Sequence, residues 1–322
     1  MIDTKGRPMG ERITVAIIGA GLTGLSCARR LAQAGLSVTV FDKGRGPGGR
    51  LATRRADHGL RFDHGAPGLT ATDPGLAALL ADLAAQGHVA RWQDGPPDAQ
   101  LTGTPAMSAI PKALARGLDL RQGAMVTALR REGRLWHLGG EGIDHAADLV
   151  VLAIPAPQAR DLLGADHPLA PALADIRYHA CITLMAGLDA AAPVPPVTGN
   201  GQGPLAKLWC DSAKPGRAGP LTAWVAHADP DWSMAQIDLP FAELAAIMAP
   251  LLVEAIGADP AHLRHAAAHR WLYARTDRAL GQPCLTHDAT GLVVGGDWAL
   301  GPSAQDGWVS GQAMAAHLLA RS

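Results

Sequence analysis

The feature that most constrains this chain is a glycine-rich turn near its start. An apolar run at residues 13–18 is followed by Gly19, Gly21 and Gly24 in the spacing Gly-x-Gly-x-x-Gly. The run is typical of a strand buried on both faces. The glycines allow a sharp turn, close approach of a pyrophosphate, and tight packing of the following helix. Because the helix N-terminus offers unpaired N–H groups, the pattern predicts a dinucleotide phosphate site.

The residues after the turn complete the context that this motif requires. Residues 26–33 continue the predicted helix, which ends at Gly35. The apolar run 36–41 predicts a second strand that ends in Asp42. An acidic residue about 20 positions beyond the glycines is well placed to accept hydrogen bonds from an adenosine ribose. Strand, turn, helix, strand and acid together favour a dinucleotide-binding fold over an accidental turn.

Composition narrows the class of protein. The chain has 322 residues and a formal net charge of -1, and its basic residues are dispersed, so neither nucleic acid nor a membrane is expected as a partner. Cys27, Cys181, Cys210 and Cys284 lack metal-ligand or redox spacing, which predicts buried thiols and no metal site. Residues 1–12 are polar, and no uncharged window is long enough to span a membrane. We therefore expect a soluble, cytoplasmic protein.

The middle of the chain predicts a second organisation. Helices are expected at 77–86, 107–117 and 241–256, and from Pro155-Ala-Pro157 through 163; strands are expected at 124–129, 135–138, 149–154 and 221–227, and loops at 94–104 and 190–203. The strands between 183 and 228 lie far from the glycine motif in sequence, so we expect them to form a separate antiparallel sheet. The predicted fold class is α/β: a Rossmann-type, doubly wound parallel sheet with a second domain built on an antiparallel sheet plus helices.

These predicted elements divide the chain into two interlocked domains. The dinucleotide-binding domain is expected to comprise residues 11–63, 101–156 and 285–322, and the substrate-binding domain residues 64–100 and 157–284.

Further motifs resemble one known family. Gly48-Gly49-Arg50 follows the second strand, and a second glycine-rich segment, Gly295-Gly296-Asp297-Trp298 with Asp306-Gly307-Trp308, lies near the C-terminus. Together with residues 108–114 and 150–157, these motifs resemble the flavin amine oxidase superfamily. Within that superfamily, segments 41–50, 53–55, 62–66, 212–217, 269–275 and 281–284 resemble bacterial renalases. The resemblance extends over nearly the whole chain.

The resemblance implies FAD as the cofactor, held non-covalently by both ends of the chain. Arg50 is expected beside the pyrophosphate, Val126 on an edge strand with its backbone against adenine, and Asp297 near the ribityl or phosphate region. A surface salt bridge is the alternative role for Arg50, and a helix cap for Asp297. The candidate cofactor-binding residues are Gly19, Gly21, Leu22, Thr23, Gly24, Asp42, Lys43, Gly49, Arg50, His64, Gly65, Ala66, Val126, Gly296, Asp297, Asp306, Gly307 and Trp308.

The last two of these residues have a specific expected role. Gly307 and Trp308 are predicted to open the final helix, whose positive end would stabilise negative charge on the reduced flavin. Residues 304–306 precede them without a cysteine, so covalent attachment of the flavin through cysteine is not expected.

The resemblance also implies an activity. Renalases take hydride from mis-reduced isomers of NAD(P)H onto flavin N5 and reduce O2 to H2O2. Loss of hydride makes a dihydropyridine aromatic without releasing a proton, so stacking geometry matters more than a protein acid or base. The candidate substrate-pocket residues are His64, Trp209, Trp224, His227, Trp271, Tyr273 and Trp298. Ordinary core packing is the alternative for each tryptophan.

Two basic residues and one histidine carry open alternatives. Lys214 and Arg217 are expected either to meet the phosphates of a dinucleotide substrate or to flank a solvated turn at Pro215-Gly216. His64 is expected either to orient a bound ring or to fix the loop at Asp63.

Two other functions remain open from the sequence. The chain departs from the renalase pattern at Pro67-Gly68-Leu69 and at residues 208–211, which leaves the substrate open. An amine oxidase would require an aromatic cage, commonly of tyrosines, and Tyr178 and Tyr273 are the only two in the chain. A non-catalytic flavin-binding regulator is the third possibility. The oligomeric state is not predicted.

Overall fold

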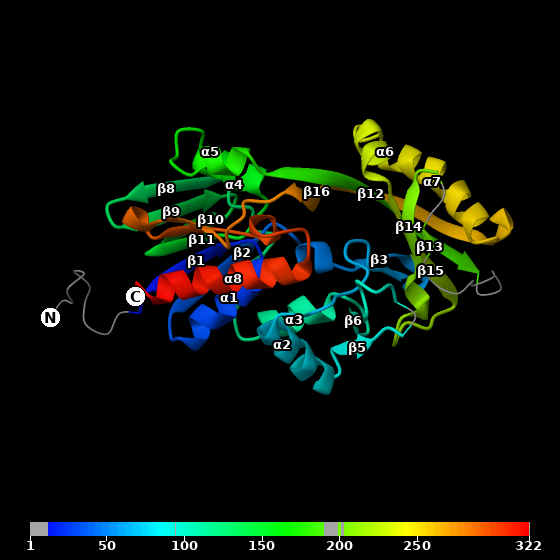
Figure 1. The fold of residues 1–322 in the computed structure, drawn as a ribbon, viewed down its shortest axis with the longest axis horizontal. Helices are drawn as coiled ribbons and strands as arrows, with labels where there is room; N and C mark the ends of the chain where they lie inside the picture. The colour runs from blue at the N-terminus through cyan, green and yellow to red at the C-terminus, as the bar shows by residue number, and fades with distance from the viewer. Residues whose placement is uncertain (1–11, 94, 190–198, 201–202, 322) are drawn as a thin grey trace.

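The molecule is elongated, with one sheet near each end (Figure 1). The computed structural model describes residues 12–93, 95–189, 199–200 and 203–321. The polar segment 1–11 lies outside the described residues, as does most of the loop expected at 190–203. Among the helices of the described residues, none is long and apolar enough to cross a membrane.

The first sheet has six strands in the order β17-β18-β11-β1-β2-β7. Their bounds are β1 (Thr14–Ile18), β2 (Ser37–Asp42), β7 (Asp119–Gln122), β11 (Leu149–Leu152), β17 (Leu285–His287) and β18 (Leu292–Val294). All neighbours pair in parallel except the edge strand β17, which pairs antiparallel with β18. Strands from both ends of the chain therefore meet in one Rossmann-type sheet, as predicted.

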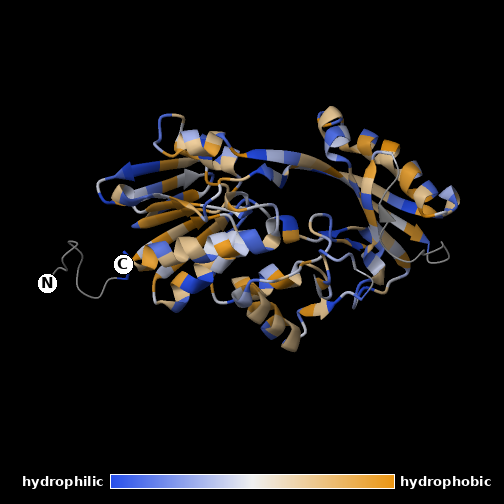
Figure 2. Cartoon of the chain, viewed as in Figure 1, coloured by the Kyte–Doolittle hydropathy of each residue, from blue (hydrophilic) through white to orange (hydrophobic). Residues whose placement is uncertain are grey.

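Both faces of this sheet are covered. Val15 and Ile17 of β1 point into a core shared with α1 (Leu22–Gln33), α2 (Pro74–Ala85), α3 (Ala109–Ala115) and α8 (Ala304–Leu319). Ala16 and Ile18 point the other way, into a core formed with the antiparallel strands β8 (Ala128–Glu132), β9 (Leu135–Gly140) and β10 (Ile143–Ala147) and with α4 (Ala156–Leu163) and α5 (Ala170–Ala174). This two-sided burial explains the continuous apolar run. Figure 2 shows the inner strands as hydrophobic and β8 as largely hydrophilic.

The first and last helices lie in direct contact. A Cβ atom at Gly311 of α8 would lie 2.0 Å from Oγ of Ser26 and 2.3 Å from the carbonyl oxygen of Thr23 in α1. Only glycine allows two helices to approach this closely, so Gly311 lets α8 pack directly against α1. The two ends of the chain therefore meet beside the glycine-rich turn.

The second sheet is antiparallel, with strand order β13-β14-β15-β12-β16. Its strands are β12 (Arg177–Asp189), β13 (Gly199–Asn200), β14 (Leu205–Cys210), β15 (Leu221–Ala228) and β16 (Leu263–Arg278), and α6 (Pro230–Ala235) and α7 (Phe241–Ala255) accompany it. Leu244, Met248 and Leu252 of α7 pack on one face of the sheet. The long strands β12 and β16 run from this sheet back toward the parallel sheet (Figure 1).

Short elements lie in the connections between these helices and strands. They are the hairpin β3 (Arg54–Arg55) with β4 (Arg61–Phe62), the pair β5 (Val89–Arg91) with β6 (Leu101–Gly103), and the 3-10 turns η1 (Gly49–Leu51), η2 (Asp57–Gly59), η3 (Asp211–Ala213), η4 (Pro260–His262), η5 (Asp288–Thr290) and η6 (Asp297–Ala299).

Some elements differ from expectation. The strand predicted to start at 124 begins at Ala128, and the loop predicted at 94–104 contains β6. The 16-residue strand β16 was not predicted, because its alanines, arginines and histidines lack the β-branched pattern of a strand.

The domain division stays a proposal. The packing of α2 into the core of the parallel sheet favours placing residues 74–85 with that sheet.

Candidate functional site

The β1–α1 turn has the geometry that a pyrophosphate site needs. Gly19 has φ +106°, and a Cβ there would lie 2.4 Å from the carbonyl oxygen of Ala153. A Cβ at Gly24 would lie 1.9 Å from the carbonyl oxygen of Gly19. Gly21 is the N-cap of α1 with no side-chain cap, and a Cβ there would meet no atom within 4 Å. An uncapped helix N-terminus that faces open space fits an anionic phosphate.

Asp42 is tied to this turn. Its carboxylate accepts hydrogen bonds from the backbone N–H of Ala20 at 2.6 Å and of Gly44 at 2.7 Å. These bonds fix the end of β2 beside the start of α1, and the carboxylate keeps lone pairs for a ribose hydroxyl. Lys43, next in the chain, is exposed. The residues present fit an adenosine ribose, although the individual contacts stay predictions.

The predicted flavin contacts Arg50 and Asp297 bind each other. The guanidinium donates two hydrogen bonds to the carboxylate, at 2.5 and 2.7 Å, and a third to the carbonyl oxygen of Ala274 at 3.0 Å. Burial alone would lower the pKa of Arg50, but the Asp297 carboxylate outweighs burial and raises it. The side chain of Asp297 is 8% exposed and that of Arg50 34%, so the pair is a partly buried salt bridge. The pair joins η1, η6 and β16.

Other candidate cofactor residues pack around this pair. The N–H of Ala66 donates to the carbonyl oxygen of Arg50 at 2.9 Å, and a Cβ at Gly65 would lie 2.1 Å from that oxygen. Gly49 has φ +53°, and a Cβ atom there would point toward the Cα atom of Gly21. Val126 is buried, but it lies between β7 and β8 rather than on the predicted edge strand.

The final helix begins earlier than expected. Ser303 caps α8, and Asp306 accepts from the N–H of Ser303 at 2.9 Å in a capping box, so Gly307 lies within the first turn instead of opening the helix. A Cβ at Gly307 would lie 3.0 Å from Oγ1 of Thr23, and a Cβ at Gly75 would lie 3.5 Å from the indole nitrogen of Trp308. Gly296 donates its N–H to Ser310 at 3.0 Å. The start of α8 therefore lies beside the start of α1.

Four predicted pocket residues come together around one backbone carbonyl. The carbonyl oxygen of His64 accepts from the indole N–H of Trp271 at 2.9 Å and lies 3.3 Å from Nε2 of His227. Trp209 meets the His227 ring edge-on at 4.7 Å. His269 lies 4.9 Å from the His64 ring and 4.5 Å from Trp271. We call these five residues the His64 cluster.

The imidazoles of the His64 cluster are neutral at pH 7. Burial, together with His269 and Arg54, lowers the pKa of His64 to about 4. Burial also lowers the pKa of His227 to about 4, and burial and Arg54 lower that of His269. The cluster therefore presents uncharged rings, with Arg54 as a nearby cation.

Three predicted pocket residues lie elsewhere. Trp224 is buried on the opposite face of the sheet, in the core that contains α7. Tyr273 meets Tyr178 edge-on, with ring centroids 5.2 Å apart. Trp298 is 1% exposed and donates its indole N–H to the carbonyl oxygen of Ile154 at 3.1 Å. Burial and the charge of Asp297 raise the pKa of Tyr178, which places this tyrosine pair near the Arg50–Asp297 pair.

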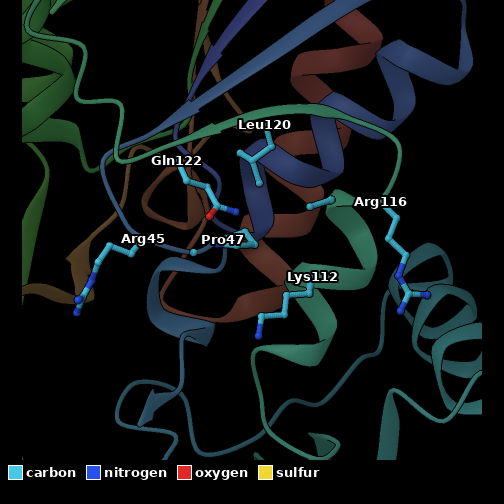
Figure 3. Close-up of a pocket in the computed structure, with 8 residues that line it drawn as sticks. Arg45, Pro47, Lys112, Arg116, Leu120 and Gln122 are labelled. Carbon is cyan, nitrogen blue, oxygen red and sulfur yellow. The ribbon is translucent and has the colours of Figure 1, made fainter. Parts of the chain in front are cut away.

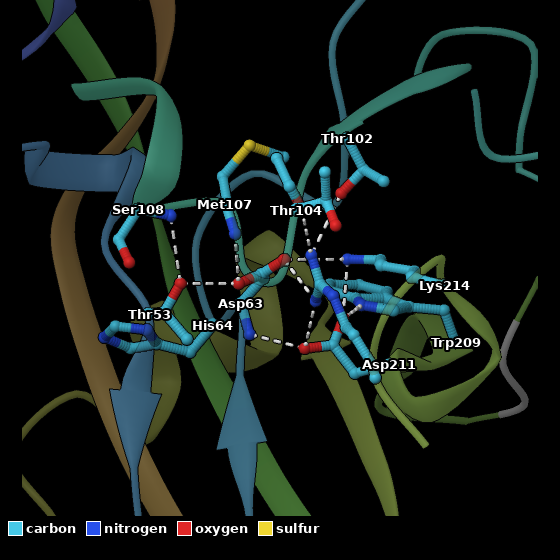
Figure 4. Close-up of polar contacts among 12 residues, drawn as sticks. Thr53, Asp63, His64, Thr102, Thr104, Met107, Ser108, Trp209, Asp211 and Lys214 are labelled. Carbon is cyan, nitrogen blue, oxygen red and sulfur yellow. Dashed lines mark hydrogen bonds and ion pairs between the residues drawn. The ribbon is translucent and has the colours of Figure 1, made fainter. Parts of the chain in front are cut away.

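Four buried charges lie next to the His64 cluster (Figure 4). Nζ of Lys214 is 3.2 Å from Oδ2 of Asp63 and 2.5 Å from Oδ1 of Asp211. Nη1 of Arg217 is 2.5 Å from Oδ2 of Asp63 and 3.0 Å from Oδ2 of Asp211. We call these residues the Asp63 quartet. None of the side chains is more than 3% exposed, so the expected phosphate contact of Lys214 and Arg217 is wrong. Pro215-Gly216 between them does form a turn with Gly216 exposed, but the two basic side chains point away from solvent.

Neutral donors add to the bonding of the two carboxylates in the quartet. Oδ1 of Asp63 accepts from the hydroxyl of Thr53 at 2.7 Å and from the N–H of Met107 at 3.1 Å. Asp211 accepts from the indole N–H of Trp209 at 3.1 Å. Burial alone would raise the pKa of Asp211, but Lys214 and Arg217 outweigh burial and lower it. Trp209 thus connects the quartet to the His64 cluster, and the side chain of Asp63 fixes its own loop.

The sequence analysis missed several residues of the site. Asp63, Asp211, His269 and Tyr178 were not among the candidates. The spacing of Asp211, Lys214 and Arg217 by three residues is a local signal, but their partner Asp63 lies about 150 positions away. His269 shares a segment with Trp271, and alternation along one strand is the signal that could have paired them.

Comparison with known proteins defines the class. Residues 88–319 match the family model described as flavin-containing amine oxidoreductase, and residues 17–83 match an NAD(P)-binding Rossmann-like domain. The chain belongs to the flavin-containing amine oxidoreductase family. The family is one of flavin-dependent oxidoreductases, and FAD is the cofactor.

Individual relatives are similar to part of this chain, but they do not support the narrower assignment to the renalases. Protoporphyrinogen oxidase 2 of Arabidopsis thaliana is 42% identical over 69 residues, which are 21% of this chain and 13% of that protein. A 4,4'-diapophytoene desaturase of Staphylococcus haemolyticus is 47% identical over 51 residues, 16% of this chain and 10% of the relative. These alignments span only about a tenth of the length of the relatives.

Two solved structures share the fold over almost the whole chain. A putative protoporphyrinogen oxidase from Exiguobacterium sp. 255-15 has a TM-score of 0.74 at 14% identity and covers 97% of this chain and 100% of its own. A double mutant of putrescine oxidase has a TM-score of 0.60 at 16% identity, with the same coverage. They confirm the predicted fold class. The superfamily is confirmed by the family model, while the renalase resemblance stays a prediction.

The glycine geometry predicts separate effects on folding and on cofactor binding. Gly21→Ala places a methyl group in open space, so we expect a folded protein that binds FAD at least about tenfold more weakly. Gly24→Ala should instead unfold the β1–α1 turn. The measurements are flavin absorbance per mole of protein and far-UV circular dichroism. Gly46→Ala is the matched control, because its Cβ also meets no atom within 4 Å. Full FAD affinity in Gly21→Ala would contradict the assignment.

The Asp63 quartet predicts a large stability effect. Lys214→Met leaves an uncompensated buried carboxylate and should lower the free energy of unfolding by about 3–5 kcal/mol. Lys207→Met removes an exposed pair with Asp98 and should cost less than about 1 kcal/mol. Urea denaturation of both variants measures the difference. Equal losses would show that Lys214 is not buried among charges.

Proposed function

We propose that this protein is an FAD-dependent oxidase that takes hydride from the dihydronicotinamide ring of mis-reduced NAD(P)H isomers. The balanced reaction converts the dihydronicotinamide, O2 and one proton into the oxidised nicotinamide and H2O2. FAD supplies the acceptor of the two electrons and passes them to O2. The observation that carries the proposal is the neutral His64 cluster, which joins rings from β14, β15 and β16 with the His64 ring just after β4.

The charge state of the cluster suits this substrate. A dihydronicotinamide ring is planar and uncharged, and it loses hydride without releasing a proton. The pKa values of His64 and His227, both lowered to about 4, keep these imidazoles neutral, so no protein base with a pKa near neutrality is required. What the protein must supply is a stacking surface in a fixed orientation.

Hydrogen bonds fix that orientation. The indole of Trp271 cannot turn without losing its bond to the carbonyl oxygen of His64. The ring of His269 meets Trp271 edge-on, with an interplanar angle of 75°, which further restricts the indole. We propose that this indole face contacts the nicotinamide ring.

Contact with the phosphates of the substrate, first expected of Lys214 and Arg217, requires a different cation. Both of these residues are engaged in the Asp63 quartet. Arg54 is exposed in β3 and close enough to lower the pKa of both His64 and His269. We therefore propose Arg54 as the contact for a phosphate of the dinucleotide.

Oxidation of an amine is the second candidate, and family membership together with the putrescine oxidase fold favours it. A cage of two tyrosines needs space for the amine between the rings. Tyr178 and Tyr273 contact each other instead, with ring centroids 5.2 Å apart. The geometry of this pair therefore supports the dihydronicotinamide over the amine.

The test is anaerobic mixing of the FAD-loaded protein with 2- or 6-dihydroNAD, followed by flavin absorbance. We expect rapid bleaching that air reverses with formation of H2O2. Trp271→Phe keeps a ring but loses the bond to His64, so bleaching should slow by roughly 10- to 100-fold. Trp136→Phe, in β9 of the other half of the molecule, loses a similar indole bond, to the carbonyl oxygen of Thr290 in η5, and should have no effect.

The other outcomes separate the alternatives. Bleaching by putrescine, with none by dihydroNAD, would replace the proposal with amine oxidation. A flavin that stays oxidised with both compounds would leave a non-catalytic flavin-binding regulator.

A further inference from the structure

Basic side chains that are dispersed in the sequence gather beside α3. A hollow of about 300 Å³ is lined by Arg45, Lys112, Arg116 and Gln122, among others (Figure 3). A second hollow of about 200 Å³ is lined by Arg55 and Arg61 and again by Lys112 and Arg116. Because the hollows share two residues, they adjoin. The sequence-based expectation of dispersed charge does not hold at this surface.

No carboxylate balances this charge. Neither hollow is lined by Asp or Glu. Within the described part of the chain, the side chains of Arg45, Arg55, Arg61, Lys112 and Arg116 form no hydrogen bond or ion pair. All five residues are exposed and thus accessible to a ligand.

The arrangement itself is unfavourable without a ligand. Arg55 and Arg61 are directly opposite each other in the β3–β4 hairpin, where like charges destabilise a cross-strand pair. Lys112 and Arg116 are four residues apart along α3 and its C-cap, a spacing at which like charges also repel. An anion bound between the two pairs would offset both repulsions through charge-assisted hydrogen bonds. Ser108, which lines the second hollow, adds a hydroxyl group.

This surface borders the expected cofactor site, because the loop between Lys43 and Gly49 contributes Arg45 to the first hollow. Gly48 bridges to Gly21 on one side, and on the other a Cβ at Gly48 would lie 2.9 Å from Cγ of Pro111 in α3. The loop before η1 therefore lies between the start of α1 and the basic hollows. Val126, the expected adenine contact, belongs to the core on the opposite face of the parallel sheet from α3.

We propose that the two hollows form one binding site for an oligophosphate, a di- or triphosphate that is either free or carried by a nucleotide. Taken together, the volumes of the two hollows fall in the range of a small-ligand site. Five cations exceed the charge of a single phosphate, which favours an oligophosphate. The site does not depend on the reaction catalysed at the flavin.

The test is isothermal titration calorimetry of the FAD-loaded protein with inorganic pyrophosphate at low ionic strength. We expect binding that weakens with added salt. Lys112→Gln/Arg116→Gln and Arg55→Gln/Arg61→Gln should each weaken it at least about tenfold, because two charge-assisted contacts are lost. Arg130→Gln/Arg134→Gln is the matched control: it removes the same charge from exposed positions in and after β8 and should change nothing. Flavin absorbance should be the same in all variants.

Further arms distinguish the sources of the phosphate. Tighter binding of ADP than of pyrophosphate would identify a nucleotide as the carrier, and equal binding would identify the free anion. No binding of either at millimolar concentration, or equal loss in the Arg130/Arg134 control, would overturn the proposal. Sedimentation with phosphatidylserine vesicles that needs these residues and is not displaced by pyrophosphate would overturn it in favour of a membrane surface.

Discussion

The Asp63 quartet is the interaction on which the substrate side of the molecule depends. Two carboxylates and two cations leave water together, which is tolerable only when every charge has partners at close range. Here the partners come from the residue after β4, from η3 and from the segment just after η3, and Thr53 and Met107 add neutral donors from the other half of the molecule. The quartet thereby ties the hairpin that precedes His64 to the antiparallel sheet.

The Asp63 quartet fixes the position of the His64 cluster. Asp63 places His64 directly, and Trp209 connects the quartet to His227, which approaches the carbonyl oxygen of His64 from the other side. Trp271 meets the same oxygen from β16. One peptide group is therefore held by residues from two strands, and the neutral rings around it form the surface to which we assign the substrate.

The cofactor half was largely predictable, and the reason is that its constraints are local. Gly19, Gly24 and Asp42 act on atoms within the β1–α1–β2 unit, apart from the contact of Gly19 with Ala153. The pairing of Arg50 with Asp297 was not predictable, because two residues expected as separate contacts lie 247 positions apart and meet only in the fold.

The substrate half shows where sequence patterns fail. Trp209 and Trp224 looked equivalent in sequence, yet Trp209 pairs with Val225 in the β14–β15 register, so Trp224 points to the opposite face. Lys214 and Arg217 are buried because they pair with Asp63, which is far away in the chain. No rule for turn sequences could predict that partner. Strand register and buried charge pairing are decided by tertiary structure, and these were the features that the sequence left open.

The central claim is that hydride leaves the substrate in a neutral pocket without proton transfer to the protein. The most direct measurement is the pH dependence of the rate of anaerobic flavin bleaching by dihydroNAD between about pH 5.5 and 8.5. With the pKa of His64 and His227 both at about 4, the account predicts a rate that does not change over this range. A rate that rises or falls about tenfold around a pKa between 6 and 8 would show a titrating protein group in the reaction and contradict the account.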